Sequence, residues 1–229
     1  MIRTVAETGS TNADLLAEAG QGASEGVWLR AERQTGGRGR AGRAWTSPPG
    51  NLYASTIVRL RPGDPPAPTL ALVAAVAAEG VASAYAGPGH LTIKWPNDIV
   101  AGPAKLAGIL LERADDAVVI GIGVNLAHHP SDLDRPAISI AALSGAAPDP
   151  HPFLVELADA FAHWLGRWRG EGLGPVRARW LARAHPIGSA LRTGGREGLF
   201  EGLTDEGALL IRYADGTNSI IRAGDVFLL

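Results

Sequence analysis

The feature that most constrains the fold is an alanine-rich, apolar stretch at residues 69–85. Its composition is typical of a helix, and because it contains so few polar residues we expect that helix to be buried. The longest apolar run within it, residues 70–78, is too short to span a bilayer. The chain has 229 residues, 46% of them hydrophobic, so it is large enough to bury this helix in one sizeable core.

Helix and strand patterns follow one another along the rest of the first 185 residues. Ser10 or Thr11 can cap a helix with Leu15, Leu16 and Ala19 facing inward. Apolar or alternating runs predict strands at residues 26–32, 51–60, 91–95, 106–112 and 117–124, with a hairpin turn at 115–116. Apolar spacing of three to four residues predicts an amphipathic helix over 153–169 and a shorter helix at 176–184.

The pattern of the sequence changes near residue 186. Short strand-like segments separated by glycine turns follow one another, and no helical pattern fits them. We therefore expect two domains, residues 1–185 and residues 186–229, the second being a small all-β, barrel-like module.

Charge and cysteine content exclude several classes of protein. The formal net charge is −2, which argues against attraction of the whole surface to nucleic acid or to an anionic membrane. The absence of cysteine removes disulfides, thiolate metal sites and a thiol nucleophile. The first residues have no basic-then-apolar signal pattern, so we expect a cytoplasmic protein that does not bind membranes.

A glycine- and arginine-rich segment, GGRGRAGRAW at residues 36–45, has no use in a core. Its glycines let backbone N–H groups approach a ligand, and its arginines offer forks for carboxylate or phosphate oxygens. An ordered anion-binding loop is the interpretation we favour, and a mobile solvated loop or a nucleic-acid-binding tract are the alternatives. The G-x-G-x-x-G match at 37–42 opens no predicted helix, which argues against a dinucleotide fold.

Three further segments hold candidate site residues. Lys94, Asn97 and Asp98 come together at the end of a predicted strand, where ordinary turn chemistry is the alternative explanation. Lys105 is the second of only two lysines in a chain that otherwise uses arginine, which suggests a need for a compact charge. Glycines in the apolar run GIGVNL, residues 121–126, indicate close approach by a ligand or another backbone, or simple packing.

Other kinds of site find no support in the sequence. The six histidines lack metal-ligand spacing, no serine has a G-x-S-x-G context, and no GK[ST] phosphate loop occurs. Any use of ATP would therefore have to proceed without that motif.

Taken in order, six segments resemble the biotin–protein ligases, the biotin–[acetyl-CoA-carboxylase] ligase family. They are GSTNADLL at 9–16, AERQTGGRGRAGRAW at 31–45, NLYAS at 51–55, KWPNDI at 94–99, KLAGILLE at 105–112 and GIGVNL at 121–126. The β-rich tail is similar to the family's small C-terminal domain, so the resemblance runs from about residue 5 to the end. Each segment alone is modest, but six in the same order make coincidence implausible.

The resemblance implies an α+β fold. A mixed sheet backed by helices, like a class II synthetase, would be followed by a C-terminal SH3-like β-barrel. It also implies a two-step reaction with ATP, biotin and Mg²⁺: biotin becomes biotinyl-5′-AMP, which then biotinylates a lysine of a biotin carboxyl carrier protein of acetyl-CoA carboxylase. The loop would supply positive charge for joining two anions and would shield the adenylate from water. Because the chain begins almost at the catalytic region, we expect no DNA-binding domain and no repressor activity.

Site residues are carried over from the resemblance position by position. Lys105 and Arg40 are the predicted catalytic residues, with Lys105 contacting the reacting carboxylate and α-phosphate. The predicted biotin-binding residues are Ser10, Thr11, Asn12, Gln34, Gly37, Arg38, Gly39, Arg40, Lys105, Gly108 and Gly123. The predicted ATP- and adenylate-binding residues are Arg38, Arg40, Trp45, Asn97, Asp98, Lys105 and Asn125, and Asp98 is also a candidate Mg²⁺ ligand.

Departures and alternatives remain. Family members often have arginine where this chain has Ala41, so one loop charge is missing. A lipoate–protein ligase is the nearest enzymatic alternative, and an arginine-glycine nucleic-acid-binding protein is the alternative from another class. The protein is expected to be a monomer or a homodimer, with its 36–45 loop ordered only when an anion binds.

Overall fold

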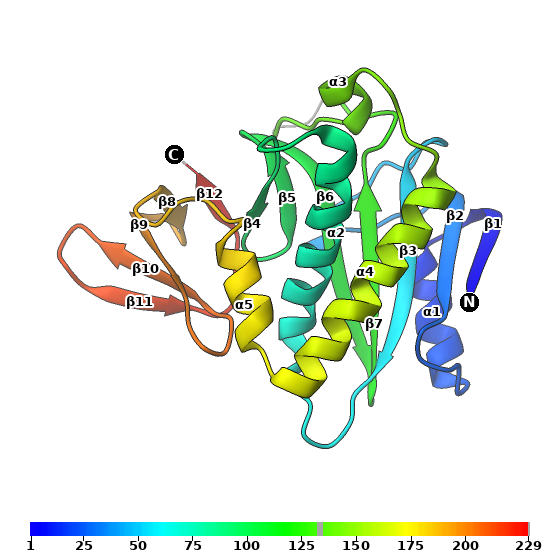
Figure 1. The fold of residues 1–229 in the computed structure, drawn as a ribbon, viewed down its shortest axis with the longest axis horizontal. Helices are drawn as coiled ribbons and strands as arrows, with labels where there is room; N and C mark the ends of the chain where they lie inside the picture. The colour runs from blue at the N-terminus through cyan, green and yellow to red at the C-terminus, as the bar shows by residue number, and fades with distance from the viewer. Residues whose placement is uncertain (132–134, 229) are drawn as a thin grey trace.

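The computed structural model describes residues 1–131 and 135–228, which form two sheets and a set of helices (Figure 1). The helices are α1 (Thr11–Gly20), α2 (Leu70–Ala86), α3 (Ile140–Ser144), α4 (Pro150–Glu171) and α5 (Gly174–Leu181), with short 3-10 turns η1 (Arg40–Gly42) and η2 (Ala67–Thr69). A mixed sheet backed by helices and followed by a small C-terminal β module confirms the predicted fold class.

The large sheet has seven strands among the described residues, in the order β1-β2-β3-β7-β6-β5-β4. They are β1 (Ile2–Thr8), β2 (Trp28–Gln34), β3 (Leu52–Arg59), β4 (Thr92–Lys94), β5 (Asp98–Ala101), β6 (Ala104–Ala114) and β7 (Ala117–Val124). Strands β1 and β2 are parallel, and the other neighbours are antiparallel. The hairpin predicted at residues 115–116 joins β6 to β7, with Ala114 opposite Ala117.

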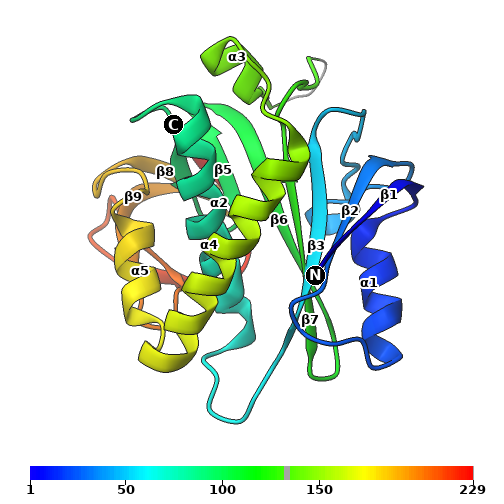
Figure 2. The same cartoon turned by 45° about the vertical axis from the view of Figure 1, so that its right-hand side comes forward.

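The two faces of the large sheet are covered by different helices. Helices α2 and α4 pack side by side over one face, and α1 lies against the other (Figures 1 and 2). Alternation along β7 divides the side chains, since Val118 joins the α2 core and Val119 joins the smaller cluster around Leu15 of α1. The predicted site residues Asn12, Gly108 and Gly123 lie on the α1 face.

Helix α2 is the buried element that the sequence predicted. With η2 it forms a helix of 20 residues, Ala67–Ala86, that is long and apolar enough to cross a membrane, but 72% of its apolar window is buried inside the protein. It contacts α4, α5 and several strands, so it is the central helix of the core. Glu79, its one charged residue, is fully buried and pairs with Arg179 and Arg183.

The second sheet follows α5 and is antiparallel in the order β11-β10-β9-β8-β12. Its strands are β8 (Ala190–Thr193), β9 (Arg196–Leu203), β10 (Leu209–Tyr213), β11 (Asn218–Ile221) and β12 (Val226–Leu228). Trp180 of α5 packs edge-on against Phe200 of β9, and Arg177 donates to the Leu203 carbonyl oxygen. The dense glycine turns predicted this sheet, and the domain boundary near residue 186 stays a prediction.

Some elements differ from the sequence-based expectation. Helix α4 begins at Pro150 because the Asp149 side chain accepts from the His151 N–H and proline suits the first turn. The segment after Pro96, for which no element was predicted, forms β5, and residues 140–144 form α3. Both are shorter than the windows in which hydrophobic periodicity is readable.

Candidate active site

A cavity of about 540 Å³ opens on the α1 face of the large sheet and reaches the second sheet. It is lined by α1, β2, the 36–45 loop, strands β3 to β7 and the start of β12. The predicted residues that line it are Ser10, Thr11, Asn12, Gln34, Arg38, Gly39, Arg40, Trp45, Asn97, Asp98, Lys105, Gly108, Gly123 and Asn125. Segments far apart in the chain therefore meet at one site, while the role of each residue stays a prediction.

The floor of the cavity is made by alternate residues of three neighbouring strands. Gly123 of β7 lies opposite Gly108 of β6, and Gly121 lies opposite Ser55 of β3. A Cβ atom added at Gly121 would lie 2.3 Å from Asn12 Oδ1, and one at Gly123 would lie 2.7 Å from Trp45 Cε2. The glycines therefore admit the side chains of α1 and of the loop, which is the close approach predicted for this strand.

One end of the cavity is polar and comes from the first turn of α1. Ser10 caps this helix by accepting from the Ala13 N–H, so Thr11 and Asn12 occupy its first positions. The Thr11 N–H donates to Gln34 Oε1 at 2.9 Å, and Gln34 Nε2 donates to Ser47 Oγ at 3.2 Å. Helix capping thus places hydroxyl and amide groups together at this end.

Gly37 is the one predicted site residue that does not line the cavity in the part of the chain that the structure describes. It is buried, and a Cβ there would lie 2.6 Å from the Trp45 carbonyl oxygen and 2.8 Å from Ser47 Oγ. Its carbonyl accepts from the Trp45 N–H at 2.9 Å. Gly37 therefore allows the two ends of the loop to meet.

The loop itself is a folded hairpin with arginines on its tip. Arg38 pairs with Ala44, and the Gly39 N–H donates to the Arg43 carbonyl at 2.7 Å. The 3-10 turn Arg40–Gly42 closes it, with Ala41 and Gly42 at positive φ values of 55° and 72°. Ala41 is exposed, so the loop charge that the resemblance led us to expect at this position would lie in solvent here.

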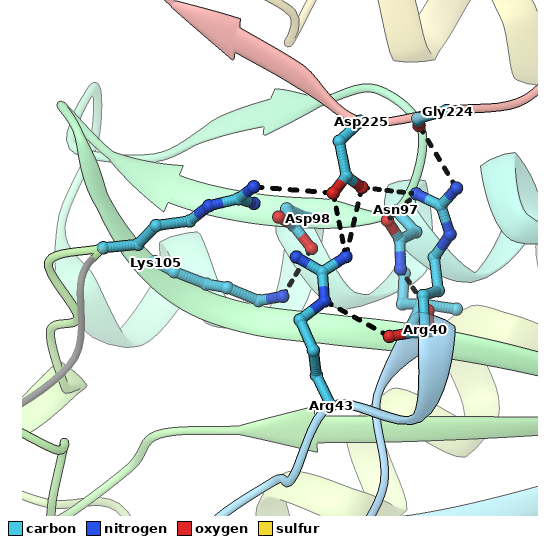
Figure 3. Close-up of polar contacts among 9 residues, drawn as sticks. Arg40, Arg43, Asn97, Asp98, Lys105, Gly224 and Asp225 are labelled. Atoms are coloured by element: carbon cyan, nitrogen blue, oxygen red, sulfur yellow. Dashed lines mark hydrogen bonds and ion pairs between the residues drawn. The ribbon is translucent and has the colours of Figure 1, made fainter.

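Asp225, the residue before β12, contacts two arginines of the loop, Arg40 and Arg43 (Figure 3). It accepts from Arg43 Nη2 at 3.0 Å and lies 3.6 Å from Arg40 Nη1 and 3.5 Å from Arg135 Nη2. Arg40 also donates to the Gly224 carbonyl at 3.1 Å and to Asn97 Oδ1 at 3.3 Å. The protein's own carboxylate thus contacts the arginines at the tip of the loop, and the ordering of the loop by a bound anion stays a prediction.

The charge of Asp225 depends on these contacts. Burial raises the pKa of this carboxyl, but the hydrogen bond from Arg43 and the charges of Arg43, Arg135 and Arg40 outweigh burial. The net effect holds the pKa of Asp225 below its usual value. Asp225 is therefore ionised whenever the loop is folded at neutral pH.

The two lysines lie near the arginine loop. Lys105 Nζ is 2.6 Å from Asp98 Oδ1 (Figure 3). It also lies 5.3 Å from the centre of the Trp45 ring. Burial is the main cause that lowers the pKa of the Lys94 ammonium; the charges of Arg135 and Lys105 lower it further, and that of Asp98 opposes them. The cavity thus has a strongly cationic end facing its polar end.

Trp45 packs on the floor of the cavity, and Asn125 has hydrogen-bond partners within the protein. The indole of Trp45 lies over Gly108 and Gly123, and its Nε1 is buried without a hydrogen-bond partner among the described residues. Asn125 donates its amide to the carbonyl of Ile138 at 3.1 Å and, more weakly, to that of Lys105. Asn125 therefore stabilises the strand ends around Lys105.

The predicted metal ligand is also committed to another partner. The two carboxylates among the described lining residues, Asp98 and Asp225, are paired with Lys105 and with arginines. No group of three His, Asp or Glu side chains that could hold a metal occurs within the described residues. A magnesium ion would thus need the phosphates of a nucleotide for most of its ligands.

Comparison with known sequences identifies the family. The sequence profile described as "Biotin/lipoate A/B protein ligase family" matches residues 10–125, about half of the chain. A biotin–[acetyl-CoA-carboxylase] ligase of Paracoccus denitrificans is 41% identical over 97% of this chain and 98% of the relative. The chain belongs to the biotin/lipoate A/B protein ligase family.

Further similarities cover the whole of this ligase-family chain. The profile "Biotin protein ligase C terminal domain" matches residues 191–229. A biotin–[acetyl-CoA-carboxylase] ligase of Mycobacterium tuberculosis is 40% identical over 97% of this chain and 86% of the relative. The solved structure of a biotin protein ligase from Aquifex aeolicus in complex with biotin and ATP superimposes with a TM-score of 0.86 at 25% identity, covering 100% of this chain and 98% of that one. The resemblance seen in the sequence is therefore confirmed.

Sequence reasoning missed several residues of the site in this ligase-family chain. Ser55, Arg43, Arg135 and Asp225 line the cavity but were not assigned to it, and Lys94 was singled out as a candidate but given no binding role. Lys94 and Arg43 lie inside segments that were singled out, so their proximity could have been inferred. Nothing in the sequence links position 225 to position 40, because that contact depends on how β12 pairs with β8.

Proposed function

We propose that this protein is an ATP-dependent biotin–protein ligase that forms biotinyl-5′-AMP and transfers biotin to a lysine of a carrier protein of acetyl-CoA carboxylase. The observation that carries the proposal is a single cavity with a hydrogen-bonding end, at Thr11 and Gln34, and a cationic end, at Arg40 and Lys105. Biotin has the same polarity, with a polar ureido ring and a carboxylate at the end of an apolar chain. The names of the relatives support biotin over lipoate.

In the first step a biotin carboxylate oxygen attacks the α-phosphorus of ATP. An O–P bond forms, the bond between the α-phosphorus and the bridging oxygen breaks, and pyrophosphate leaves with that electron pair. Two anions must approach each other, so fixed positive charge lowers the barrier. Lys105, oriented by Asp98 at 2.6 Å, and Arg40, held by Asn97 and Gly224, are the groups proposed to supply it.

In the second step the amine of the carrier lysine attacks the carbonyl carbon of the mixed anhydride. A C–N bond forms, AMP leaves with the electrons of the C–O bond, and the amine loses a proton. The attacking group belongs to the partner, so the absence of cysteine from this chain has no cost. Folding of the 36–45 loop over the cavity would protect the anhydride from water.

Magnesium belongs to this proposal as the companion of ATP, with Asp98 as the nearest candidate ligand. When bound it would neutralise phosphate charge. Cytoplasmic location, the monomer or homodimer state, and the absence of nucleic-acid and membrane partners remain expectations from the sequence.

The test is ATP–pyrophosphate exchange by the purified protein with Mg²⁺, run with biotin, with lipoate and with neither. We expect exchange only with biotin, followed by a mass increase of one biotinyl group on a carrier domain. Exchange with lipoate alone would keep the chemistry and change the substrate. No exchange with either, combined with salt-sensitive DNA binding, would favour the nucleic-acid alternative.

A further inference from the structure

Glu112 lies behind the polar end of the cavity. It sits on β6 opposite Val119 of β7, so its side chain belongs to the α1 face of the sheet, and it is half-buried. Asn12 Nδ2 donates to Glu112 Oε2 at 2.8 Å. Within the described part of the chain Glu112 does not line the cavity, so it acts on any ligand through Asn12.

Asn12 is the first link in a chain of short hydrogen bonds that reaches the cavity. Ser55 Oγ donates to Asn12 Oδ1 at 2.6 Å, and Thr11 Oγ1 lies 2.7 Å from Ser55 Oγ. Ser55 and Thr11 are almost fully buried and line the cavity. Gly121, which has no side chain, leaves room for the Asn12 oxygen beside the strand.

The direction of these hydrogen bonds follows from the chemistry of Glu112. A carboxylate only accepts, so Asn12 must turn its NH₂ group to Glu112 and its oxygen to Ser55. The single proton of Ser55 is then used on Asn12, so Ser55 accepts from Thr11 at 2.7 Å, a shorter contact than the one between Thr11 Oγ1 and Gln34 Oε1 at 3.2 Å. With its own proton used on Ser55, Thr11 Oγ1 can only accept from a group in the cavity.

We propose that Glu112 is a positioning residue that fixes the direction of the Asn12–Ser55–Thr11 hydrogen bonds and so makes the polar end of the cavity select a ligand with N–H donors. A ureido ring presents such donors, and the dithiolane ring of lipoate does not. This role of Glu112 rests on the proposed biotin ligation. It would explain why the protein selects a ureido ligand such as biotin.

The substitution Glu112→Gln tests this with almost no change of shape. A glutamine can donate as well as accept, so Asn12 can turn over and reverse every bond in the chain. The Thr11 proton is then free to point to Gln34 Oε1, 3.2 Å away, or into the cavity, where it meets the N–H groups of the ligand. The site then loses its preference for ligands with N–H donors, while the volume of the cavity stays the same.

Calorimetric titration with biotin alone is the direct readout. We expect Glu112→Gln to weaken biotin binding about ten-fold, the size of one hydrogen bond to an ordered ligand. The KM for ATP and the melting temperature should stay near those of the unmodified protein, a pattern that a merely structural role would not give. The matched control is Glu32→Gln, at an exposed position of β2, which should change none of them.

Combination with Ser55→Ala isolates the hydrogen-bond chain. Ser55→Ala cuts the path between Asn12 and Thr11, so adding Glu112→Gln to it should cost little further affinity. Unchanged biotin affinity in Glu112→Gln, or equal losses with and without Ser55, would overturn the assignment of Glu112. A lack of biotin binding and of biotin-dependent exchange in the unmodified protein would instead overturn the proposed function itself.

Discussion

The two faces of strands β3, β6 and β7 are built from alternate residues of the same segments, yet they serve different purposes. On the α2 face, β7 presents Val118, Ile120 and Ile122, all buried in the main core. On the α1 face the same strand presents Gly121 and Gly123, which leave room for Asn12 and Trp45. On the α2 face, large side chains stabilise the core. On the α1 face, the absence of side chains at the glycines leaves room for a binding site.

The comparison shows that the effect of a substitution on stability or on ligand binding depends on which face of the sheet the residue occupies, and this alternates from one residue to the next along a strand. A change at an even position of β7 should affect unfolding, and a change at 121 or 123 should affect ligand binding. Neighbouring residues thus offer matched experiments within one strand.

The largest effect is expected at the cationic end of the α1 face. Lys105→Ala should lower the rate of biotin-dependent exchange by roughly 100- to 1,000-fold, because it removes a charge aimed at the reacting anions. Arg113→Ala, at an exposed cation further along β6, is the control and should leave the rate unchanged. Equal rates in the two variants would remove Lys105 from the chemistry.

On the core face, Ile120→Ala should lower the free energy of unfolding by roughly 2–5 kcal/mol, since it deletes a fully buried side chain. The KM for biotin should not change. Urea unfolding with parallel kinetics would check this, and a raised KM with normal stability would contradict the division between the faces.

One residue further along, Gly121→Ala places a Cβ where Asn12 Oδ1 now lies, at 2.3 Å. Asn12 must shift, and a displacement of that size should lower biotin affinity by about 100-fold or less while the chain still folds. Calorimetric titration measures it, with Gly80→Ala in α2, where nothing lies within 4 Å, as the control. Unaltered binding would show that the floor tolerates a side chain.

At the tip of the loop, Asp225→Ala should make the 36–45 segment about 2- to 10-fold more sensitive to trypsin, because partly exposed ion pairs are individually weak. The control is Asp215→Ala, in the turn between β10 and β11, where the carboxylate pairs with Arg196. If both variants are cut at the same rate as the unmodified protein, Asp225 does not hold the loop.

The smallest effect expected is that of pH on the same contact. Because the folded pKa of Asp225 is lowered, its contribution is complete above the unfolded value, about 4, and is lost only as pH falls through the lower folded value. Trypsin resistance of the loop, scaled to an unfolded reference peptide, should be constant from pH 8 to pH 6. A loss within that range would point to a group other than Asp225.

The sequence predicted the parts of the fold with strong local patterns. The apolar composition of α2, the periodicity of α4 and the turn spacing of β8 to β12 are all visible without tertiary contacts. Strand β5 has only four residues, and the Asp225 contact joins two sheets, so neither leaves a local signal. For the site, the resemblance located the cavity residues, but Glu112 was missed because a residue that acts through another one has no pattern of its own.

The hydrogen bond from Arg40 to the Gly224 carbonyl joins residues 184 positions apart. Closing so long a stretch of chain costs much entropy until the intervening segments have folded. The strand pairs that form the glycine floor, Gly108 with Gly123 and Ser55 with Gly121, are closer in sequence, so the floor can form earlier. We therefore expect the arginine loop to be the last part of the site to take shape during folding. A newly folded large sheet would then have the glycine floor of the cavity in place while the 36–45 loop did not yet cover it.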